Sequence, residues 1–112
     1  MLASIYGLPK NDLDKVKEDG VLYQSENFGA RVLSKEVGGI SRFAFVVSTK
    51  VSGQAVQRNR IKRAMSESVR HWMHLIKRRH DVIFLPKKRI VKKSTDEIMN
   101  EVHGFIVKNL SE

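Results

Sequence analysis

The sequence predicts an α+β fold, a two-layer α-β sandwich with the element order α-β-β-β-α-β-α and helices on one face of a four-stranded sheet. Two observations carry this prediction. Runs rich in Val, Ile, Phe and Tyr fill residues 21–34 and 40–50, whereas residues 55–79 and 94–110 repeat apolar side chains every three or four positions. The 112 residues contain no repeat and no Pro- or Ser-rich linker, so we expect one domain over residues 1–112.

A short helix is expected over residues 11–19. Asn11 or Asp12 would cap its start, and Gly20 would end it. The small apolar face of this helix would consist of Leu13 and Val16.

The β-rich runs 21–34 and 40–50 predict two or three antiparallel strands. The segment KEVGG (35–39) separates them, and its glycines suit a hairpin connection. Further along the chain, DVIFLP (81–86) is a short apolar run stopped by Pro86, which is typical of a buried strand. The sheet would therefore have four strands.

Two longer helices complete the pattern. From Ala55 to about Arg79 the apolar positions trace one stripe of a helix with 3.6 residues per turn. Ser94 begins an S-x-x-E capping box, in which Glu97 would reach back to the start of the last helix. The stripe of the long helix comprises Ile61, Ala64, Met65, Ser68, Val69, Trp72, Leu75 and Ile76, and that of the last helix Ile98, Met99, Val102, Phe105, Ile106 and Leu110.

Positive charge is concentrated in one part of the chain, whose formal net charge is +9. Residues 54–93 contain 13 of the 21 Lys and Arg residues but only 2 of the 12 Asp and Glu residues, which gives this segment +11 and leaves −2 for the rest. A basic surface on a near-neutral domain is typical of a protein that binds a polyanion.

The start of the long helix carries cations where the helix dipole is already positive. Arg58, Arg60, Lys62 and Arg63 fall in its first two turns, and no acid follows before Glu67. Because a guanidinium fork binds two phosphate oxygens at once, this pattern favours phosphate binding. On a helical wheel, Asn59, Arg63, Ser66 and Arg70 lie opposite the apolar stripe, Arg60 and Lys62 flank them, and Arg58 borders the stripe.

The alternation in FGARVL places Gly29 and Arg31 on the same face of a strand. An arginine beside a glycine would let single-stranded RNA lie close to the sheet. An edge-strand arginine that points into solvent is the equally simple alternative.

The sequence offers no catalytic machinery of its own. It has no cysteine, Gly-rich phosphate loop or Ser/His/Asp constellation. His71 and His74 have a metal-compatible spacing but basic neighbours, and Asp12 and Asp14 fit the stabilising acids of a helix start better than a nuclease pair. We therefore expect no catalytic residue and no metal ligand.

Residues 58–63, RNRIKR, together with the segments around them, closely resemble the bacterial ribonuclease P protein subunit family. VVSTKVSGQAV precedes them, and DVIFLPKK follows the long helix. The likeness is to the family's Arg-Asn-Arg motif after a strand that ends in a Ser-x-Lys turn, here Ser48-Thr49-Lys50, and it covers about residues 8–110. It implies an α-β sandwich with a left-handed β-α-β crossover, an exception to the usual right-handed rule.

The resemblance also implies a mechanism. The holoenzyme would remove the 5′ leader of precursor tRNA by Mg²⁺-dependent hydrolysis, with the metal bound mainly by the catalytic RNA subunit. This chain would bind that RNA through the long helix and the single-stranded leader in a cleft between helix and sheet. The RNA-binding residues would be Lys50, Arg58, Asn59, Arg60, Lys62, Arg63 and Arg70, and the leader cleft would involve Leu13, Lys17, Gly29, Arg31 and Ser66.

Several positions depart from the family pattern. Leu13 and Lys17 stand where many members have aromatic residues, Arg31 replaces a tyrosine, and Ser66 replaces an arginine. We therefore expect this cleft to hold the leader more by charge than by base stacking.

The sequence is also compatible with other functions. The main alternative is a non-enzymatic basic RNA-binding module associated with the ribosome; a DNA major-groove binder and a protein-only nuclease are weaker. The expected partners are ribonuclease P RNA and precursor tRNA, with no membrane and no obligate protein partner. The lack of cysteine, of an export signal and of an 18-residue apolar run favours a cytoplasmic location.

Overall fold

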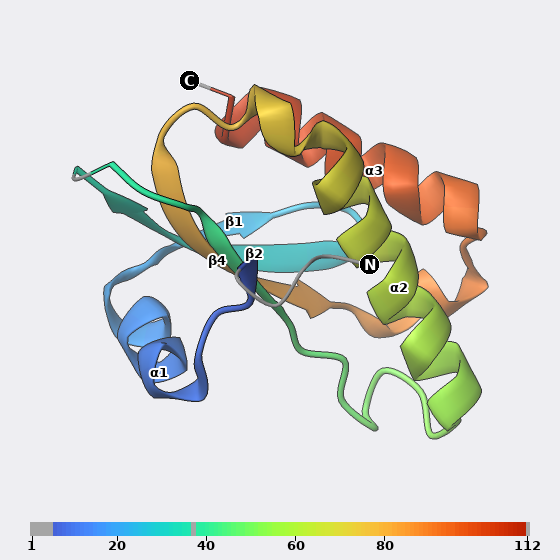
Figure 1. Ribbon diagram of the computed structural model, residues 1–112. Coiled ribbons are helices and arrows are strands. Elements are labelled where there is room, and N and C mark those ends of the chain that lie inside the picture. The colour runs from blue at the N-terminus through green and yellow to red at the C-terminus, as the bar shows by residue number, and fades with distance from the viewer. Residues whose placement is uncertain (1–5, 37, 112) are drawn as a thin grey trace.

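The structure, a computed structural model, describes residues 6–36 and 38–111, so Val37 in the expected hairpin connection lies outside the described residues. The elements follow the predicted order (Figure 1). The helices are α1 (Lys10–Asp19), α2 (Ala55–Trp72) and α3 (Thr95–Asn109), with the 3-10 helices η2 (Met73–Leu75) and η3 (Lys88–Lys92); the strands are β1 (Val21–Gln24), β2 (Phe28–Lys35), β3 (Arg42–Phe45) and β4 (Arg79–Pro86).

The sheet has the order β1-β2-β4-β3. β1 and β2 form an antiparallel pair, β4 runs antiparallel to β2, and β3 runs parallel to β4. The expected hairpin between the second and third strands is therefore wrong, because β4 lies between them. Val82, Ile83 and Phe84 of β4 are each 0% exposed, and a strand buried on both faces belongs in the interior of a sheet. The connection from β3 through α2 to the parallel β4 is a β-α-β crossover.

The helices divide between the two faces of the sheet (Figure 1). α2 and α3 cover one face, where Phe28, Val32 and Phe84 join the main core, so this sandwich of sheet and helices is as predicted. α1, which was expected on the same face, packs instead on the other, over a smaller core that includes Val16 and Ile83. Apolar side chains alternate to both faces of β2 and β4, and α1 covers those that α2 and α3 cannot reach.

The long helix is shorter than its apolar pattern predicts. α2 ends at Trp72 and continues as the 3-10 turn η2 rather than reaching Arg79. Arg79 and His80 pair instead with Lys35 and Ser34 of β2. Strand pairing therefore overrides the helical periodicity of the last residues.

At the ends of the other two helices, one predicted cap is wrong and two are confirmed. α1 begins after Pro9, with no side-chain cap, so neither Asn11 nor Asp12 is its N-cap. Gly20 does end the helix: a Cβ at this position would lie 2.4 Å from the backbone oxygen of Val16. At the start of α3 the capping box is present as predicted, because the Ser94 hydroxyl accepts from the Glu97 amide at 3.1 Å and the Glu97 carboxylate accepts from the Ser94 amide at 3.0 Å.

Candidate nucleic-acid interface

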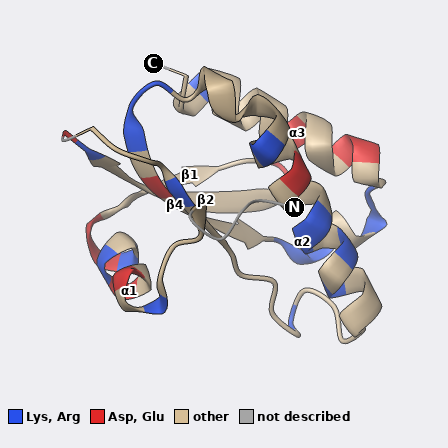
Figure 2. Ribbon diagram, viewed as in Figure 1, with Lys and Arg blue, Asp and Glu red and all other residues tan. Residues whose placement is uncertain are grey.

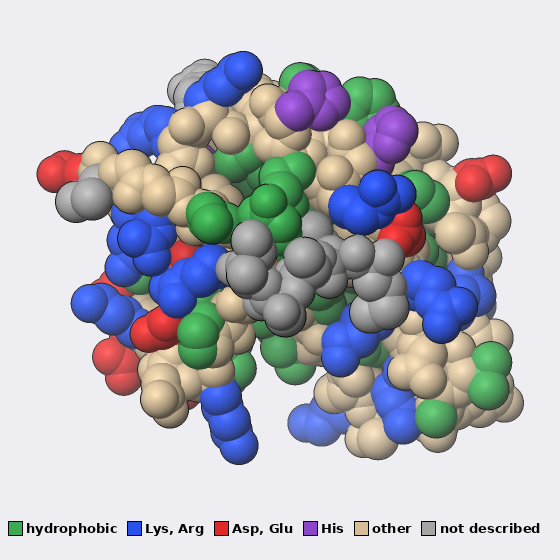
Figure 3. Space-filling model, viewed as in Figure 1, with side chains coloured by type: hydrophobic (Ala, Val, Ile, Leu, Met, Phe, Trp, Pro, Cys, Tyr) green, Lys and Arg blue, Asp and Glu red, His purple; other side chains and the backbone are tan. Residues whose placement is uncertain are grey.

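The outer surface of α2 carries cations along its first turns (Figures 2 and 3). Asn59, Lys62 and Arg63 are exposed, as their positions on the helical wheel predict. The first turn contains no acidic residue, and the side chain of Gln54 does not cap it. The helix dipole and the side chains of Lys62 and Arg63 therefore present positive charge near the same end of α2.

Arg58 and Arg60, the two arginines of the RNR motif, are half-buried and bind protein groups. Arg58 donates from Nη1 to the backbone oxygen of Ser52 at 3.0 Å. Arg60 donates to the backbone oxygens of Lys93 and Val91 at 3.0 and 3.1 Å, and to the Gln57 side chain at 3.1 Å. Their guanidinium groups are thus occupied within the fold, which the sequence did not reveal.

Arg70 also has a protein partner. It is exposed, and its guanidinium donates to a carboxylate oxygen of Glu67 at 2.9 Å. This hydrogen bond is the main reason why the pKa of Glu67 is lowered to about 2. Glu67 thus offsets part of the charge of Arg70, and it stays ionised at a lower pH than an ordinary glutamate does.

Lys50 lies in the turn that precedes α2. Its side chain is exposed, and its amide donates to the Ser48 hydroxyl at 3.3 Å, which holds the predicted Ser-x-Lys turn. The next residue, Val51, is 7% exposed and anchors the turn in the main core. The turn thus presents Lys50 to solvent from a fixed position.

Four of the five expected leader-cleft residues belong to the face of the sheet that α1 covers. Leu13 packs in the small core under α1, and Lys17 is exposed on the same helix. Arg31 of β2 is half-buried and lies between Leu22 of β1 and Ile83 of β4 in the strand register. The fourth residue, Gly29, is buried; a Cβ there would meet the side chains of Gln24 and Leu22 at 3.5 and 3.6 Å, so β1 fills part of the space that the sequence suggested was open.

Ser66 is not brought together with those residues. It lies on α2, which packs on the opposite face of the sheet, and it is 3% exposed. Its hydroxyl donates to the backbone oxygen of Arg63, one turn earlier in the same helix. The assignment of Ser66 to the outer face of the long helix was therefore wrong.

An ion-pair network that sequence reasoning missed holds α1 on the sheet. Arg42 of β3 donates to Asp81 of β4 through two bonds of 2.8 and 3.1 Å, and to Asp12 of α1 at 2.9 Å. Asp81 is 1% exposed, and these carboxylates raise the pKa of Arg42. A signal was available, because an acid at the head of a buried apolar run requires a cationic partner.

His71, near the end of α2, and His74, in η2, are exposed, and both rings contact Trp72. His103 of α3 stacks on the same tryptophan, with ring centroids 3.7 Å apart. The described part of the chain contains no group of three or more His, Cys, Asp and Glu residues that could hold a metal ion. Within residues 6–36 and 38–111, no helix is long and apolar enough to cross a membrane.

The fold and the cationic α2 surface define a small basic α+β sandwich protein with a parallel β-α-β crossover. The family model described as Ribonuclease P matches residues 8–109, and the chain belongs to this family. It is thereby a protein component of ribonuclease P, a ribonucleoprotein endoribonuclease of tRNA processing. This result confirms the resemblance to the ribonuclease P protein family.

Individual relatives agree. The chain is 35% identical to the ribonuclease P protein component of Synechocystis sp. over 86 residues. The matched segment covers 70% of this chain and 69% of the relative. The solved structure of the Staphylococcus aureus RNase P protein superposes with a TM-score of 0.83 at 25% identity, covering 96% of this chain and 98% of that one. The RNase P protein from Thermotoga maritima shares the fold, with a TM-score of 0.80 at 21% identity over 91% and 96% of the two chains.

Proposed function

We propose that this chain binds the catalytic RNA subunit of ribonuclease P through the exposed face of α2, and the 5′ leader of precursor tRNA on the face of the sheet that α1 covers. One observation carries the proposal besides the family: Asn59, Lys62 and Arg63 are exposed at a helix start that has no acidic residue in its first turn. Such charge is unfavourable for the isolated helix and favourable once phosphates lie against it.

The leader would lie against cations rather than aromatic rings. Arg31 and Lys17 supply charge, and Leu13 supplies an apolar contact. Arg42 would support this site indirectly, because it ties α1 to the sheet through Asp12. Protein contacts to the leader would favour precursor over mature tRNA, since mature tRNA lacks that segment.

Hydrolysis of the phosphodiester bond belongs, in this proposal, to the RNA subunit, which would hold the Mg²⁺ ions that activate water and stabilise the leaving oxygen. The protein residues bind and orient. Lys62 and Arg63 would neutralise phosphates of the folded RNA, and this would lower the Mg²⁺ concentration that the holoenzyme needs.

The test is cleavage of precursor tRNA at low Mg²⁺ by a ribonuclease P RNA alone, with this protein, and with Lys62→Ala/Arg63→Ala. We expect the wild-type protein to stimulate cleavage and the double variant to lose most of that effect. Lys77→Ala/Lys108→Ala is the matched control, because it removes the same charge from exposed positions outside the proposed surfaces.

Two outcomes would contradict the proposal. If the control loses as much stimulation as Lys62→Ala/Arg63→Ala, net charge rather than the α2 surface is responsible. The second outcome is that the wild-type protein does not stimulate cleavage by a matched ribonuclease P RNA, yet binds ribosomal RNA tightly without dependence on a tRNA leader. The chain would then be better described as a ribosome-associated RNA-binding module.

A further inference from the structure

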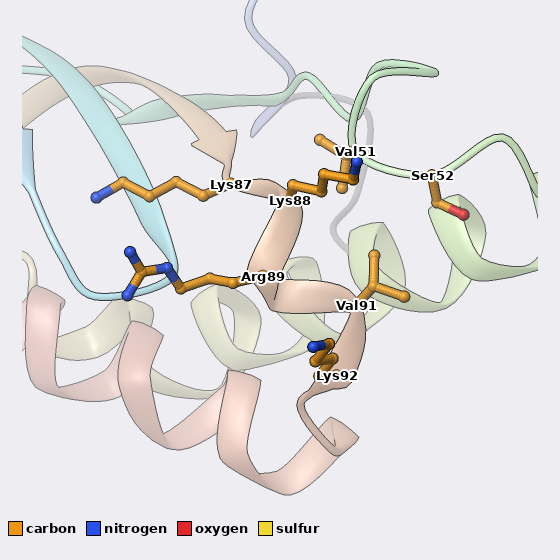
Figure 4. Close-up of a pocket in the computed structure, with 7 residues that line it drawn as sticks. All are labelled: Val51, Ser52, Lys87, Lys88, Arg89, Val91 and Lys92. Carbon is orange, nitrogen blue, oxygen red and sulfur yellow. The ribbon is translucent and has the colours of Figure 1, made fainter.

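A second concentration of cations lies beside the start of α2, at η3. An open groove of about 710 Å³ runs between the turn at Val51–Ser52 and η3 (Figure 4). In Figure 4, Lys88 extends toward Val51, whereas Lys87 and Arg89 extend together in the other direction. No acidic residue lines this basic groove, whose walls are Val51, Ser52, Lys87, Lys88, Arg89, Val91 and Lys92.

Three of these cations are available to a ligand. Lys87 donates from Nζ to the backbone oxygen of Ser25 at 2.7 Å and is therefore engaged within the fold. Lys88, Arg89 and Lys92 are exposed, and none of them forms an ion pair with any of the residues that the structure describes. Like charges gathered in this way repel one another unless an anion lies among them.

The two arginines of the RNR motif hold the two walls of the groove. Arg58 donates to the oxygen of Ser52 in one wall. Arg60 donates to the oxygen of Val91 in the other wall and to the oxygen of Lys93, just after η3. Ile90, which is 0% exposed, anchors η3 in the main core from below. A short 3-10 helix with five basic residues in and around it is thus fixed against α2 by the burial of Ile90 and by the guanidinium group of Arg60.

We propose that the basic groove binds the ribose-phosphate backbone of the ribonuclease P RNA subunit through Lys88, Arg89 and Lys92, and that Arg58 and Arg60 are positioning residues that shape it. This inference rests on the proposed function and extends its RNA-binding surface beyond α2. A polyanion fits because Lys87, Lys88, Arg89 and Lys92 are four of the seven lining residues and none of the seven is acidic, and phosphate charge is what such a surface neutralises.

The RNA subunit is favoured over the leader because of where η3 lies. Ile90 and Val91 pack in the same core as Ile61 of α2. Leu13, by contrast, packs in the small core on the opposite face of the sheet. An RNA docked on Lys62 and Arg63 therefore has the groove on its own side of the sheet, whereas a leader bound beside α1 does not.

The first test measures the affinity of the RNA subunit for the wild-type protein, for Lys88→Ala/Arg89→Ala and for Lys77→Ala/Lys108→Ala over a range of salt concentrations. The slope of log K against log salt reports the phosphates that are neutralised, about 0.7 to 0.9 for each. We expect Lys88→Ala/Arg89→Ala to reduce the slope by about 1.5 and to weaken binding, while the control keeps the wild-type slope.

The second test separates positioning from direct contact. If Arg60 acts through η3, Arg60→Ala should weaken binding by itself but add little to Lys88→Ala/Arg89→Ala, a non-additive double-mutant cycle. Amide hydrogen exchange at residues 88–93 should rise in Arg60→Ala, which direct phosphate contact does not predict. Thermal melting of each variant confirms that the compared proteins are folded.

The outcomes are distinct. A wild-type slope for Lys88→Ala/Arg89→Ala, with RNA binding intact, overturns the groove and leaves the proposed function standing. If the losses of RNA affinity in Arg60→Ala and Lys88→Ala/Arg89→Ala are additive, and amide hydrogen exchange at residues 88–93 is unchanged, Arg60 contacts the RNA directly and its positioning role is overturned. A wild-type protein that does not bind the RNA subunit removes both proposals.

Discussion

Arg58, Arg60 and Arg63 belong to one cationic stretch of sequence, yet their guanidinium groups have different surroundings. Arg63 is exposed on α2, whereas Arg58 and Arg60 donate to backbone oxygens of other segments. A guanidinium group has five N–H donors in a fixed planar fork, whereas the lysine ammonium has three on one atom, so arginine can reach carbonyl oxygens that are farther apart. We infer that arginine is required at 58 and 60 for a different reason than at 63.

Loss of Arg42 should destabilise the fold, because its partner Asp81 is a buried carboxylate. Asp81 is 1% exposed, and Arg42→Ala would leave this carboxylate buried without its cation. Breaking such a pair from one side should lower the free energy of unfolding by about 3 kcal/mol. Urea denaturation of Arg42→Ala, with Asp12→Asn as the matched control, measures this.

Asp12 belongs to the same network but is more exposed, at 41% of its side chain. Asp12→Asn should therefore lower the free energy of unfolding by less than about 1 kcal/mol. Equal losses in the two variants would mean that the α1 contact, rather than the burial of Asp81, dominates the network.

Replacement of glycine should have opposite effects on stability within α3 and at the residue that ends α1. Gly104 lies within α3, and a Cβ there would meet no atom within 4 Å, so Gly104→Ala should raise the free energy of unfolding by about 0.5 to 1 kcal/mol through helix propensity. Gly20→Ala should lower it by about 1 to 3 kcal/mol, because its Cβ would lie 2.4 Å from the oxygen of Val16. Thermal and urea denaturation of the two variants should show shifts of opposite sign, and a gain for Gly20→Ala would mean that the end of α1 relaxes freely.

Local sequence patterns predicted which helices and strands form more accurately than they predicted which of these elements lie next to one another. The capping box at Ser94 and the buried strand ending at Pro86 depend on residues close in sequence, and both are present. The expected hairpin through residues 35–39 failed because the partner of β2 is β4, which follows α2 in the chain. The apolar periodicity also could not predict that α2 ends at Trp72, because that end depends on the pairing of Arg79 with β2.

Considered as a whole, the molecule places its two sets of candidate contacts on opposite sides of one sheet. α2 and η3 pack on one face, and α1 packs on the other. Residue types and spacing predicted the basic α2 surface, because charge patterning is written in the sequence. They could not predict that Ser66 is buried or that Arg60 is bound to η3, because both facts depend on which segments meet in the folded chain.

The leader site leads to a prediction about salt. Base stacking on aromatic side chains contributes about 1 to 3 kcal/mol per base and depends little on ionic strength. Here Leu13, Lys17 and Arg31 occupy the positions where the family resemblance leads us to expect aromatic residues, so binding of the leader should depend on cations instead. The quantity to measure is the ratio of affinities of the holoenzyme for precursor tRNA with and without a leader.

If Lys17 and Arg31 each neutralise one leader phosphate, this ratio should fall by about 10- to 30-fold over a tenfold rise in salt, since each phosphate of a single strand contributes about 0.7 to the slope. Lys17→Ala/Arg31→Ala should abolish the salt dependence of the ratio, whereas Lys77→Ala/Lys108→Ala should preserve it. A ratio that stays constant with salt in the wild-type protein would show that apolar contacts or stacking hold the leader, and that the cations beside α1 serve another purpose.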